Sequence, residues 1–199
     1  MVCSFGHLSC FSVYPTKNLG AFGDGGAVVT EDENLAHRLR LIREYVWEER
    51  DGSKITGMNT RLDELQAAFL SIKLGFLTAE NQKRCEIARF YTENLSSTAL
   101  TCPQQTPGTR SVYHLYVVES EHRELLRSFL AENGVGTAIH YPLAVHQQPA
   151  YLGRLKGCDK LPVTERLVGQ ILSLPMFPQL TSEETAQVCQ LVRQFLHLH

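Results

Sequence analysis

The sequence has no long apolar run and almost no excess of charge of one sign. No stretch of about 18 consecutive apolar residues is present, so we expect no transmembrane helix. The N-terminal segment lacks the charged-then-apolar layout of a signal peptide, which makes a cytoplasmic location the default expectation. The formal net charge is -2, from 19 Lys and Arg against 21 Asp and Glu. Because there is no basic stripe for a phosphate backbone, nucleic acid is not expected as a partner.

Closely spaced cysteines are also absent. The chain has six cysteines, but they never form a CxxC pair, so neither a zinc site nor a dense disulfide framework is predicted. We expect reduced thiols that mostly serve packing, at Cys3, Cys10, Cys85, Cys102, Cys158 and Cys189.

Length and composition are those of an ordinary globular protein. The 199 residues are 43% hydrophobic and 20% charged, enough for one full domain or two small ones with a real core. The sequence shows neither an internal repeat nor a low-complexity tract. A domain boundary is predicted within a long helical segment, and it divides the chain into residues 1–77 and 78–199.

The first part predicts strand, turn, strand and helix, then a loop and a second helix. Residues 8–14 mix apolar and small side chains like a buried strand, which Pro15 ends because proline cannot donate to a sheet ladder. Lys17 therefore lies just past a strand end. After a glycine cluster we expect a strand at 27–30 and then a helix through about Arg43, which a Thr30/Glu33 capping box would begin. A polar loop is predicted at 48–57. The helix after it has an apolar face formed by Leu62, Leu65, Phe69, Ile72 and Phe76.

The second part predicts a compact α+β domain. A helix continues from Thr78 through about Leu95, with a possible break before it near Gly75. A final helix begins with a Thr181/Glu184 capping box and carries apolar residues at core spacing. Between these two helices the pattern predicts strands at 112–118, 135–139 and 172–174, a helix at 121–133 and a loop at 140–151.

The residues that are best suited to catalysis or cofactor binding surround Lys17. A lysine partly removed from water has a lowered pKa, so its neutral amine can attack an aldehyde and form a Schiff base near neutral pH. Ser12 offers a hydroxyl to an anionic group, and the Gly23-Asp24-Gly25-Gly26 turn lets the backbone approach a ligand closely. The alternative is a solvated surface lysine followed by an ordinary hairpin turn.

The segment FSVYPTKNLGAFGDGGAVVT resembles the lysine segment of the DegT/DnrJ sugar aminotransferase family, typically written SFxxTKNLxxxGDGGxxxT. The resemblance extends in family order through GMNTRLDELQAA at 57–68, YHLYV at 113–117 and HYP at 140–142 with a following His-Gln pair, so it covers essentially the whole chain. It implies an α/β fold of the fold-type I class of pyridoxal-phosphate (PLP) enzymes. Residues 1–77 would be the C-terminal part of the large PLP-binding domain, and residues 78–199 the small α+β domain.

The same resemblance implies roles for seven residues. Lys17 would form the Schiff base with PLP and transfer the proton, Ser12 would bind the PLP phosphate, and Asn59 would reach the phosphate in a neighbouring subunit of a homodimer. For Asn59, helix N-capping is an equally good interpretation. Substrate contacts would come from Tyr14, His140, Tyr141 and His146, although Tyr14 could pack in the core and the other three could serve a structural loop.

The activity that the resemblance implies is transfer of an amino group from an amino acid such as glutamate to a nucleotide-linked keto sugar, in polysaccharide or glycoside biosynthesis. Family members that dehydrate sugars carry histidine where this chain carries Lys17, so transamination is favoured. Relatives place further cofactor contacts before the lysine, including the acid on the pyridine nitrogen, and none can be assigned here. The alternative is therefore a truncated, catalytically silent family member that acts only as a dimerisation or binding module, with exposed sheet edges that favour aggregation.

Overall fold

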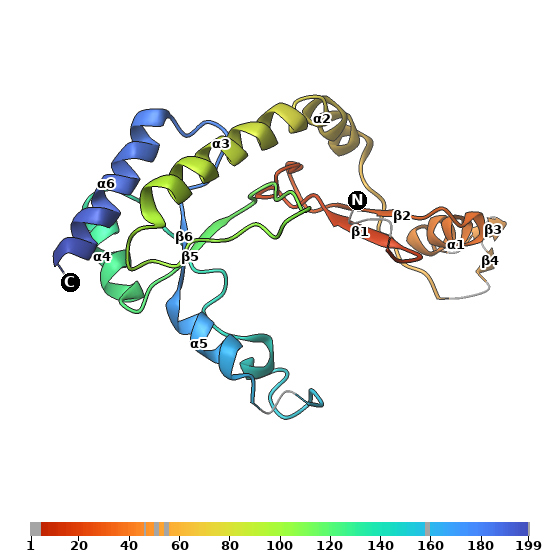
Figure 1. Cartoon of the computed structure of the whole chain (residues 1–199). Coiled ribbons are helices and arrows are strands. Elements are labelled where there is room, and N and C mark those ends of the chain that lie inside the picture. Colours follow the sequence, from red (N-terminus) through yellow and green to blue (C-terminus); the bar gives the residue numbers. More distant parts are fainter. Residues whose placement is uncertain (1–4, 46, 50–51, 54–55, 158–159, 199) are drawn as a thin grey trace. The chain divides into compact units, whose positions relative to one another are not determined.

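The computed structural model describes residues 5–45, 47–49, 52–53, 56–157 and 160–198. These residues belong to two compact units, Met1–Thr78 and Ala79–His199 (Figure 1). Their assignment to a large and a small domain of a PLP enzyme stays a prediction. Cys3 and Cys158 lie outside the described residues, whereas the other four cysteines are free thiols.

The first unit begins with two antiparallel strands, β1 (Ser9–Ser12) and β2 (Gly26–Val29). Their register pairs Ser9 with Val29 and Ser12 with Gly26. The thirteen-residue connection that contains Lys17 therefore leaves and re-enters the strand pair at the same end. The hairpin of β3 (Trp47–Glu49) and β4 (Gly52–Ser53) was not predicted, because the sequence there indicated a polar loop.

Helix α1 (Glu33–Arg43) follows β2, but the predicted Thr30/Glu33 capping box is wrong. Asp32 is the N-cap, and its Oδ1 accepts hydrogen bonds from the backbone N–H groups of Asn34 at 2.8 Å and Leu35 at 3.1 Å. An N-cap side chain reaches only the second and third helical amides, so Thr30 lies too early in the chain for this role. Its hydroxyl instead donates to the backbone oxygen of His7 at 2.7 Å.

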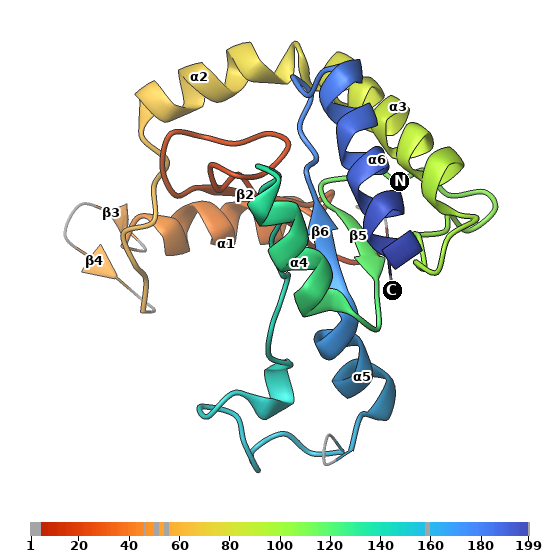
Figure 2. The ribbon, with the colours of Figure 1, turned by 90° about the vertical axis from the view of Figure 1, so that its left-hand side faces the viewer.

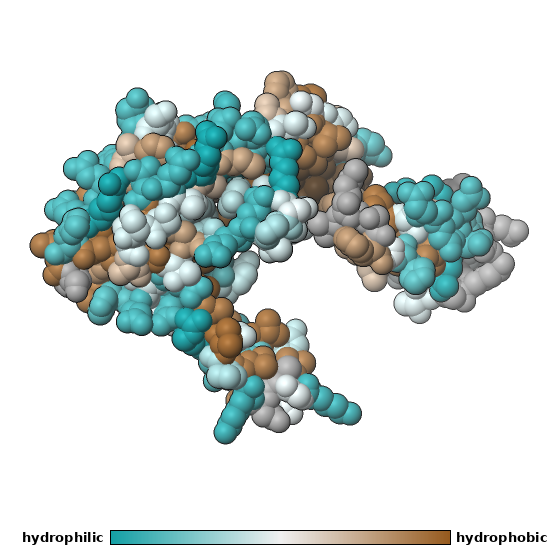
Figure 3. Space-filling view, in the orientation of Figure 1, coloured by the Kyte–Doolittle hydropathy of each residue, from teal (hydrophilic) through white to brown (hydrophobic). Residues whose placement is uncertain are grey.

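Helices α2 (Glu64–Leu74) and α3 (Leu77–Leu95) confirm the predicted helical segment with its break at Gly75. Most of the predicted apolar face is exposed to solvent: Leu65 and Ile72 of α2 and Phe76 just after it show 68%, 63% and 63% of their surface. Figure 3 shows this gathering of apolar residues over α2. Among the described residues, no helix combines the length and the apolar character that a membrane span requires.

The second unit is built around strands β5 (Tyr116–Glu119) and β6 (Ile171–Leu174), which pair antiparallel. Helix α4 (Arg123–Glu132) packs against α6 (Ser182–Leu198) and β6, and Figure 2 shows α4 and α6 side by side. The core draws on both strands, on these two helices and on α3; its side chains with less than 2% exposure are Ala88, Tyr91, Leu95, Tyr116, Val118, Leu126, Leu130, Leu172, Cys189, Val192 and Phe195.

Two of the predicted elements at 112–139 differ in the structure. The strand predicted at 112–118 begins only at Tyr116, because Tyr113 adopts a positive φ of 42° that interrupts an extended backbone. The strand predicted at 135–139 is wrong: within the described residues, only Ala138 pairs there, in an isolated bridge with Ser173 of β6. Helix α5 (Pro162–Gln170) was not predicted, although Pro162 is well suited to a first helical turn.

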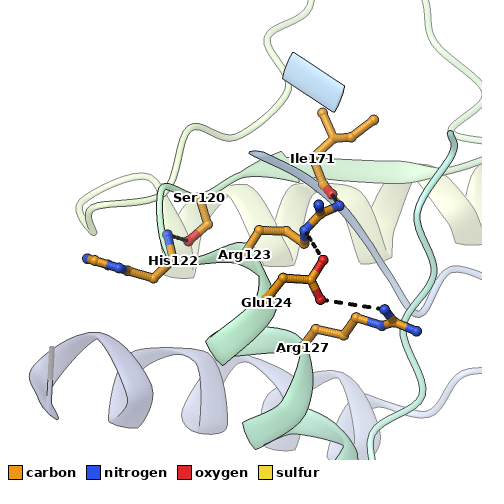
Figure 4. A network of polar contacts seen from close by, with 6 residues as sticks. All are labelled: Ser120, His122, Arg123, Glu124, Arg127 and Ile171. Carbon is orange, nitrogen blue, oxygen red and sulfur yellow. Dashed lines mark hydrogen bonds and ion pairs between the residues drawn. The ribbon is translucent and has the colours of Figure 1, made fainter. Parts of the chain in front are cut away.

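Arginine side chains connect the elements of this unit. Buried Arg84 of α3 donates from one terminal nitrogen to the backbone oxygen of Met176 at 2.9 Å, and burial lowers the pKa of its guanidinium. Arg123, at the start of α4, donates to the Ile171 oxygen of β6 at 3.4 Å and forms an ion pair with Glu124 at 2.9 Å (Figure 4). Both arginines thus fix β6 or the segment after it to a helix.

Candidate functional site

The loop that carries Lys17 is closed by backbone hydrogen bonds at its base. The N–H of Ala21 donates to the oxygen of Val13 at 2.8 Å, and the N–H of Val13 donates to the oxygen of Gly25 at 3.0 Å. Val13 and Ala21 are 7% and 4% exposed, so they form the small buried base of the loop. Lys17, within the same loop, is half-buried.

A tight turn sets the position of Lys17 within the loop. Its backbone N–H donates to the oxygen of Tyr14 at 2.8 Å, which places Pro15 at the second position of the turn, where its fixed φ is favourable. Gly20 then passes very close to Pro15: a Cβ at Gly20 would lie 2.3 Å from the Pro15 oxygen. Only glycine fits there, because any other residue would press its side chain into the backbone of the turn.

One face of α2 holds the far side of the same loop. Gln66 accepts a hydrogen bond from the N–H of Phe22 at 3.0 Å through its Oε1. The ring of Phe69 contacts that of Phe22 edge-on, with 4.6 Å between centroids. The Nζ of Lys73 donates to the backbone oxygen of Gly20. Residues 66, 69 and 73 are spaced along one helical face, so α2 fixes the loop at two points.

Ser12 and Tyr14 flank the start of this loop. Ser12 is exposed at the end of β1, and its hydroxyl oxygen accepts the N–H of Tyr14 at 3.3 Å. This contact uses an oxygen lone pair and leaves the hydroxyl proton available to an anion. Tyr14 is 49% exposed, which excludes the alternative of a core tyrosine in this chain. Lys17, Ser12 and Tyr14 therefore lie together on β1 and its loop.

Asn59 lies elsewhere in the first unit and is not a helix N-cap. Helix α2 begins at Glu64 with Asp63 as its N-cap, so the N-capping interpretation of Asn59 is wrong. Its backbone instead bridges to Glu44 after α1. Its Oδ1 accepts from Arg61 Nε at 3.2 Å, and Arg61 forms an ion pair with Glu44 at 3.3 Å. Since the amide oxygen is engaged, the Asn59 NH2 group remains as a donor for an anion.

The other three predicted residues share one segment of the second unit. His140 is half-buried, with Nδ1 2.8 Å from the hydroxyl of Ser173, and Tyr141 is 68% exposed. His146 is 9% exposed, and its Nε2 lies 3.2 Å from Glu165 Oε1. Only Tyr141 thus shows most of its side chain to solvent.

The groups near Lys17 fit the chemistry of PLP. An amine that a rigid loop presents half-buried suits an aldehyde, and a hydroxyl with a free proton suits a phosphate. The required glycine at position 20 keeps side-chain bulk out of the turn before the lysine.

Comparison with known proteins decides the family. Residues 1–193 match the DegT/DnrJ/EryC1/StrS aminotransferase family. The chain belongs to this family. It is 42% identical over 189 residues to the dTDP-3-amino-3,4,6-trideoxy-alpha-D-glucose transaminase of Streptomyces venezuelae, covering 94% of this chain and 50% of the relative. The chain therefore spans about half the length of this curated relative.

Solved structures of family members give the same result for the fold. The chain resembles S. venezuelae DesV in complex with a ketimine intermediate, with a TM-score of 0.92, 42% identity, and coverage of 96% of this chain and 52% of that one. It also resembles NtdA of Bacillus subtilis with bound cofactor PMP, with a TM-score of 0.87, 27% identity, and coverage of 97% and 46%. The prediction of a fold-type I α/β architecture is confirmed.

Several residues that support the DegT/DnrJ family motifs were not predicted from the sequence. Gln66 and Lys73 hold the lysine loop, Arg61 orients Asn59, and Glu165 contacts His146. A helix prediction at 162–170 from Pro162 would have drawn attention to Glu165 in its first turn. Its contact with a residue 19 positions earlier has no sequence signal.

Proposed function

We propose that this chain, through Lys17, takes part in PLP-dependent transfer of an amino group from an amino acid such as glutamate to a nucleotide-linked keto sugar. The observation that carries the proposal is the family match over residues 1–193, with the family's lysine on a loop fixed by Gly20 and α2. The 42% identical relative is named a transaminase of a dTDP-linked amino sugar. Because the chain covers half of that relative, the complete reaction is part of the proposal.

PLP, when bound, supplies an electron sink for the carbon that loses or gains a proton. Lys17 would hold the cofactor covalently and move that proton with its amine. Ser12, with its hydroxyl proton unused by its contact to Tyr14, would donate to the phosphate. Asn59 would donate from its NH2 group to the phosphate in a second copy, which makes a homodimer part of the proposal.

Substrate recognition is proposed for Tyr14 and for the segment that carries His140, Tyr141 and His146. Tyr14 lies beside the lysine turn and is half exposed, as a residue that lines a sugar pocket would be. The amino donor and a cytoplasmic location remain predictions.

Reductive trapping tests the proposal directly. The purified chain is mixed with PLP, reduced with borohydride and digested, and mass spectrometry locates the adduct. We expect one adduct per chain, at Lys17, which is lost in Lys17→Arg. The control Lys83→Arg changes an exposed lysine of α3 and should keep the adduct. No adduct, or a spread over many lysines, would contradict a role for Lys17.

A second candidate function is a dimerisation or binding module without catalysis. The exposed apolar stripe of α2 favours it, because contiguous apolar surface on a protein marks interaction sites. Under this alternative the chain would associate, as measured by sedimentation velocity, and trap no PLP at Lys17. Ile72→Lys, at a residue that is 63% exposed, would then reduce association without changing the helix.

A further inference from the structure

The segment His140–His146 is held at both ends by its histidines. At one end, His140 Nδ1 lies 2.8 Å from the hydroxyl of Ser173 on β6. At the other, His146 Nε2 lies 3.2 Å from Glu165 Oε1 on α5. Both histidines are thus engaged by the protein itself, through a ring nitrogen each.

The first attachment follows from the backbone. Ala138 and Ser173 exchange two backbone hydrogen bonds, of 2.7 Å and 3.2 Å. His140 follows Ala138 by two residues, so this bridge brings its ring close enough for Nδ1 to reach the Ser173 hydroxyl. Ser173 is 4% exposed, which gives this contact a rigid partner.

The second attachment depends on the carboxylate of Glu165. Its Oε1 accepts the backbone N–H of Leu161 at 3.0 Å as well as the contact from His146. Leu161 is the N-cap residue of α5, so the carboxylate is fixed at the helix start. An ionised carboxylate only accepts hydrogen bonds, so His146 must carry a proton on Nε2. Because His146 is 9% exposed, few other partners can replace Glu165.

Between the two histidines, the segment turns outward. Tyr141 is 68% exposed and Leu143 is 38% exposed, whereas Ala144 is buried. A ligand that approaches this segment from solvent therefore meets Tyr141 before either histidine.

We propose that Glu165 is a positioning residue: it holds His146, as Ser173 holds His140, and the segment between them presents Tyr141 to the nucleotide-linked substrate. The identity of the ligand in this proposal rests on the proposed function, whereas the role of Glu165 in holding the segment does not. It assigns the two histidines to positioning and leaves direct contact to Tyr141. Loss of the Glu165 carboxylate should release the His146 end of the segment.

Backbone amide spectra of the 15N-labelled full chain test the geometry without a ligand. Glu165→Ala should shift the amide signals of residues 140–148, while Glu165→Gln, whose amide oxygen still accepts both hydrogen bonds, should leave them near their original positions. Glu121→Gln, a change at an exposed glutamate before α4, is the matched control. Signals at 140–148 that stay unchanged in Glu165→Ala would overturn the proposal.

Titration with dTDP-glucose, followed by calorimetry, then tests the functional part. We expect Glu165→Ala to weaken binding by about ten-fold, the size of one lost hydrogen bond to a charged group, and Glu165→Gln to recover most of the affinity. Equal affinity in Glu165→Ala and the unsubstituted chain would overturn the positioning role. If the unsubstituted chain binds no dTDP-glucose, recognition of a dTDP-linked sugar is ruled out, while the spectra still decide whether Glu165 holds the segment.

Discussion

Substitution of Gly20 by alanine should displace the lysine loop. The added Cβ would lie 2.3 Å from the oxygen, 2.8 Å from the carbonyl carbon and 3.1 Å from the Cα of Pro15. Real Cβ atoms are not found so close to backbone atoms, so the turn at Pro15 must move by about 1 Å to restore ordinary contact. The oxygen that Lys73 contacts belongs to Gly20, so this attachment would be disturbed as well.

The free-energy cost of Gly20→Ala is expected to equal that of overpacking, about 1–3 kcal/mol. A value near 2 kcal/mol would shift an equilibrium between native and displaced loop by roughly thirty-fold. The rate at which Lys17 is trapped by PLP and borohydride should fall, while the far-ultraviolet circular dichroism spectrum stays the same. Gly6→Ala is the control, because a Cβ there meets its nearest atom at an ordinary 3.4 Å. Trapping and urea denaturation of Gly20→Ala that match those of Gly6→Ala would refute the reasoning.

Three further predictions concern the second unit. Phe195→Ala should lower the free energy of unfolding by about 3–5 kcal/mol, because the ring is 1% exposed, whereas Leu198→Ala, at 66% exposure, should change it by less than about 0.5 kcal/mol in the same urea titration. Thr181→Ala should cost about 1 kcal/mol by the same method through loss of the α6 cap. The pKa of Glu165 is lowered, first by the hydrogen bond from the Leu161 N–H and then by His146. The carboxylate therefore stabilises the folded chain fully above its ordinary pKa of 4.5, and this stabilisation is lost as the pH falls through the lowered pKa. Urea midpoints measured from pH 6 to 3 should decline less in Glu165→Gln than in the unsubstituted chain.

The elements with local signals were predictable from the sequence. The Thr181/Glu184 capping box is confirmed in both directions: the Thr181 N–H donates to Glu184 at 2.9 Å and the Glu184 N–H donates to Thr181 at 3.1 Å. The equivalent pattern at Thr30/Glu33 failed because Asp32 was a better placed acceptor. A motif of this kind therefore predicts a helix start reliably only when no other capping residue stands closer to the first turn.

The residues of the candidate site were predictable where a motif carries them, and their supports were not. Lys17 and Ser12 belong to one segment, and the strand pattern correctly predicted a strand before Lys17. The strand is shorter than predicted, Ser9–Ser12 instead of 8–14, and it is exposed rather than buried. The hydrogen bonds that fix the loop come from Gln66 and Lys73, 44 and 53 residues from their partners. Such separations depend on how the chain folds back, which periodicity along the sequence does not encode.

Helix α2 shows the limit of the periodic signal most directly. The apolar period correctly predicted a helix, but of its stripe Phe69 contacts the lysine loop, whereas Leu65 and Ile72 are exposed. The hydrogen bonds to the loop come from Gln66 and Lys73. A polar face suits the loop, because the loop offers backbone N–H and C=O groups that need partners. Leu65 and Ile72 have no such task within the described residues of this unit, where they stay exposed. The side chains of α2 therefore separate two properties: Gln66, Phe69 and Lys73 bear on the placement of Lys17, and Leu65 and Ile72 bear on association. Substitutions in one group should leave the other property unchanged.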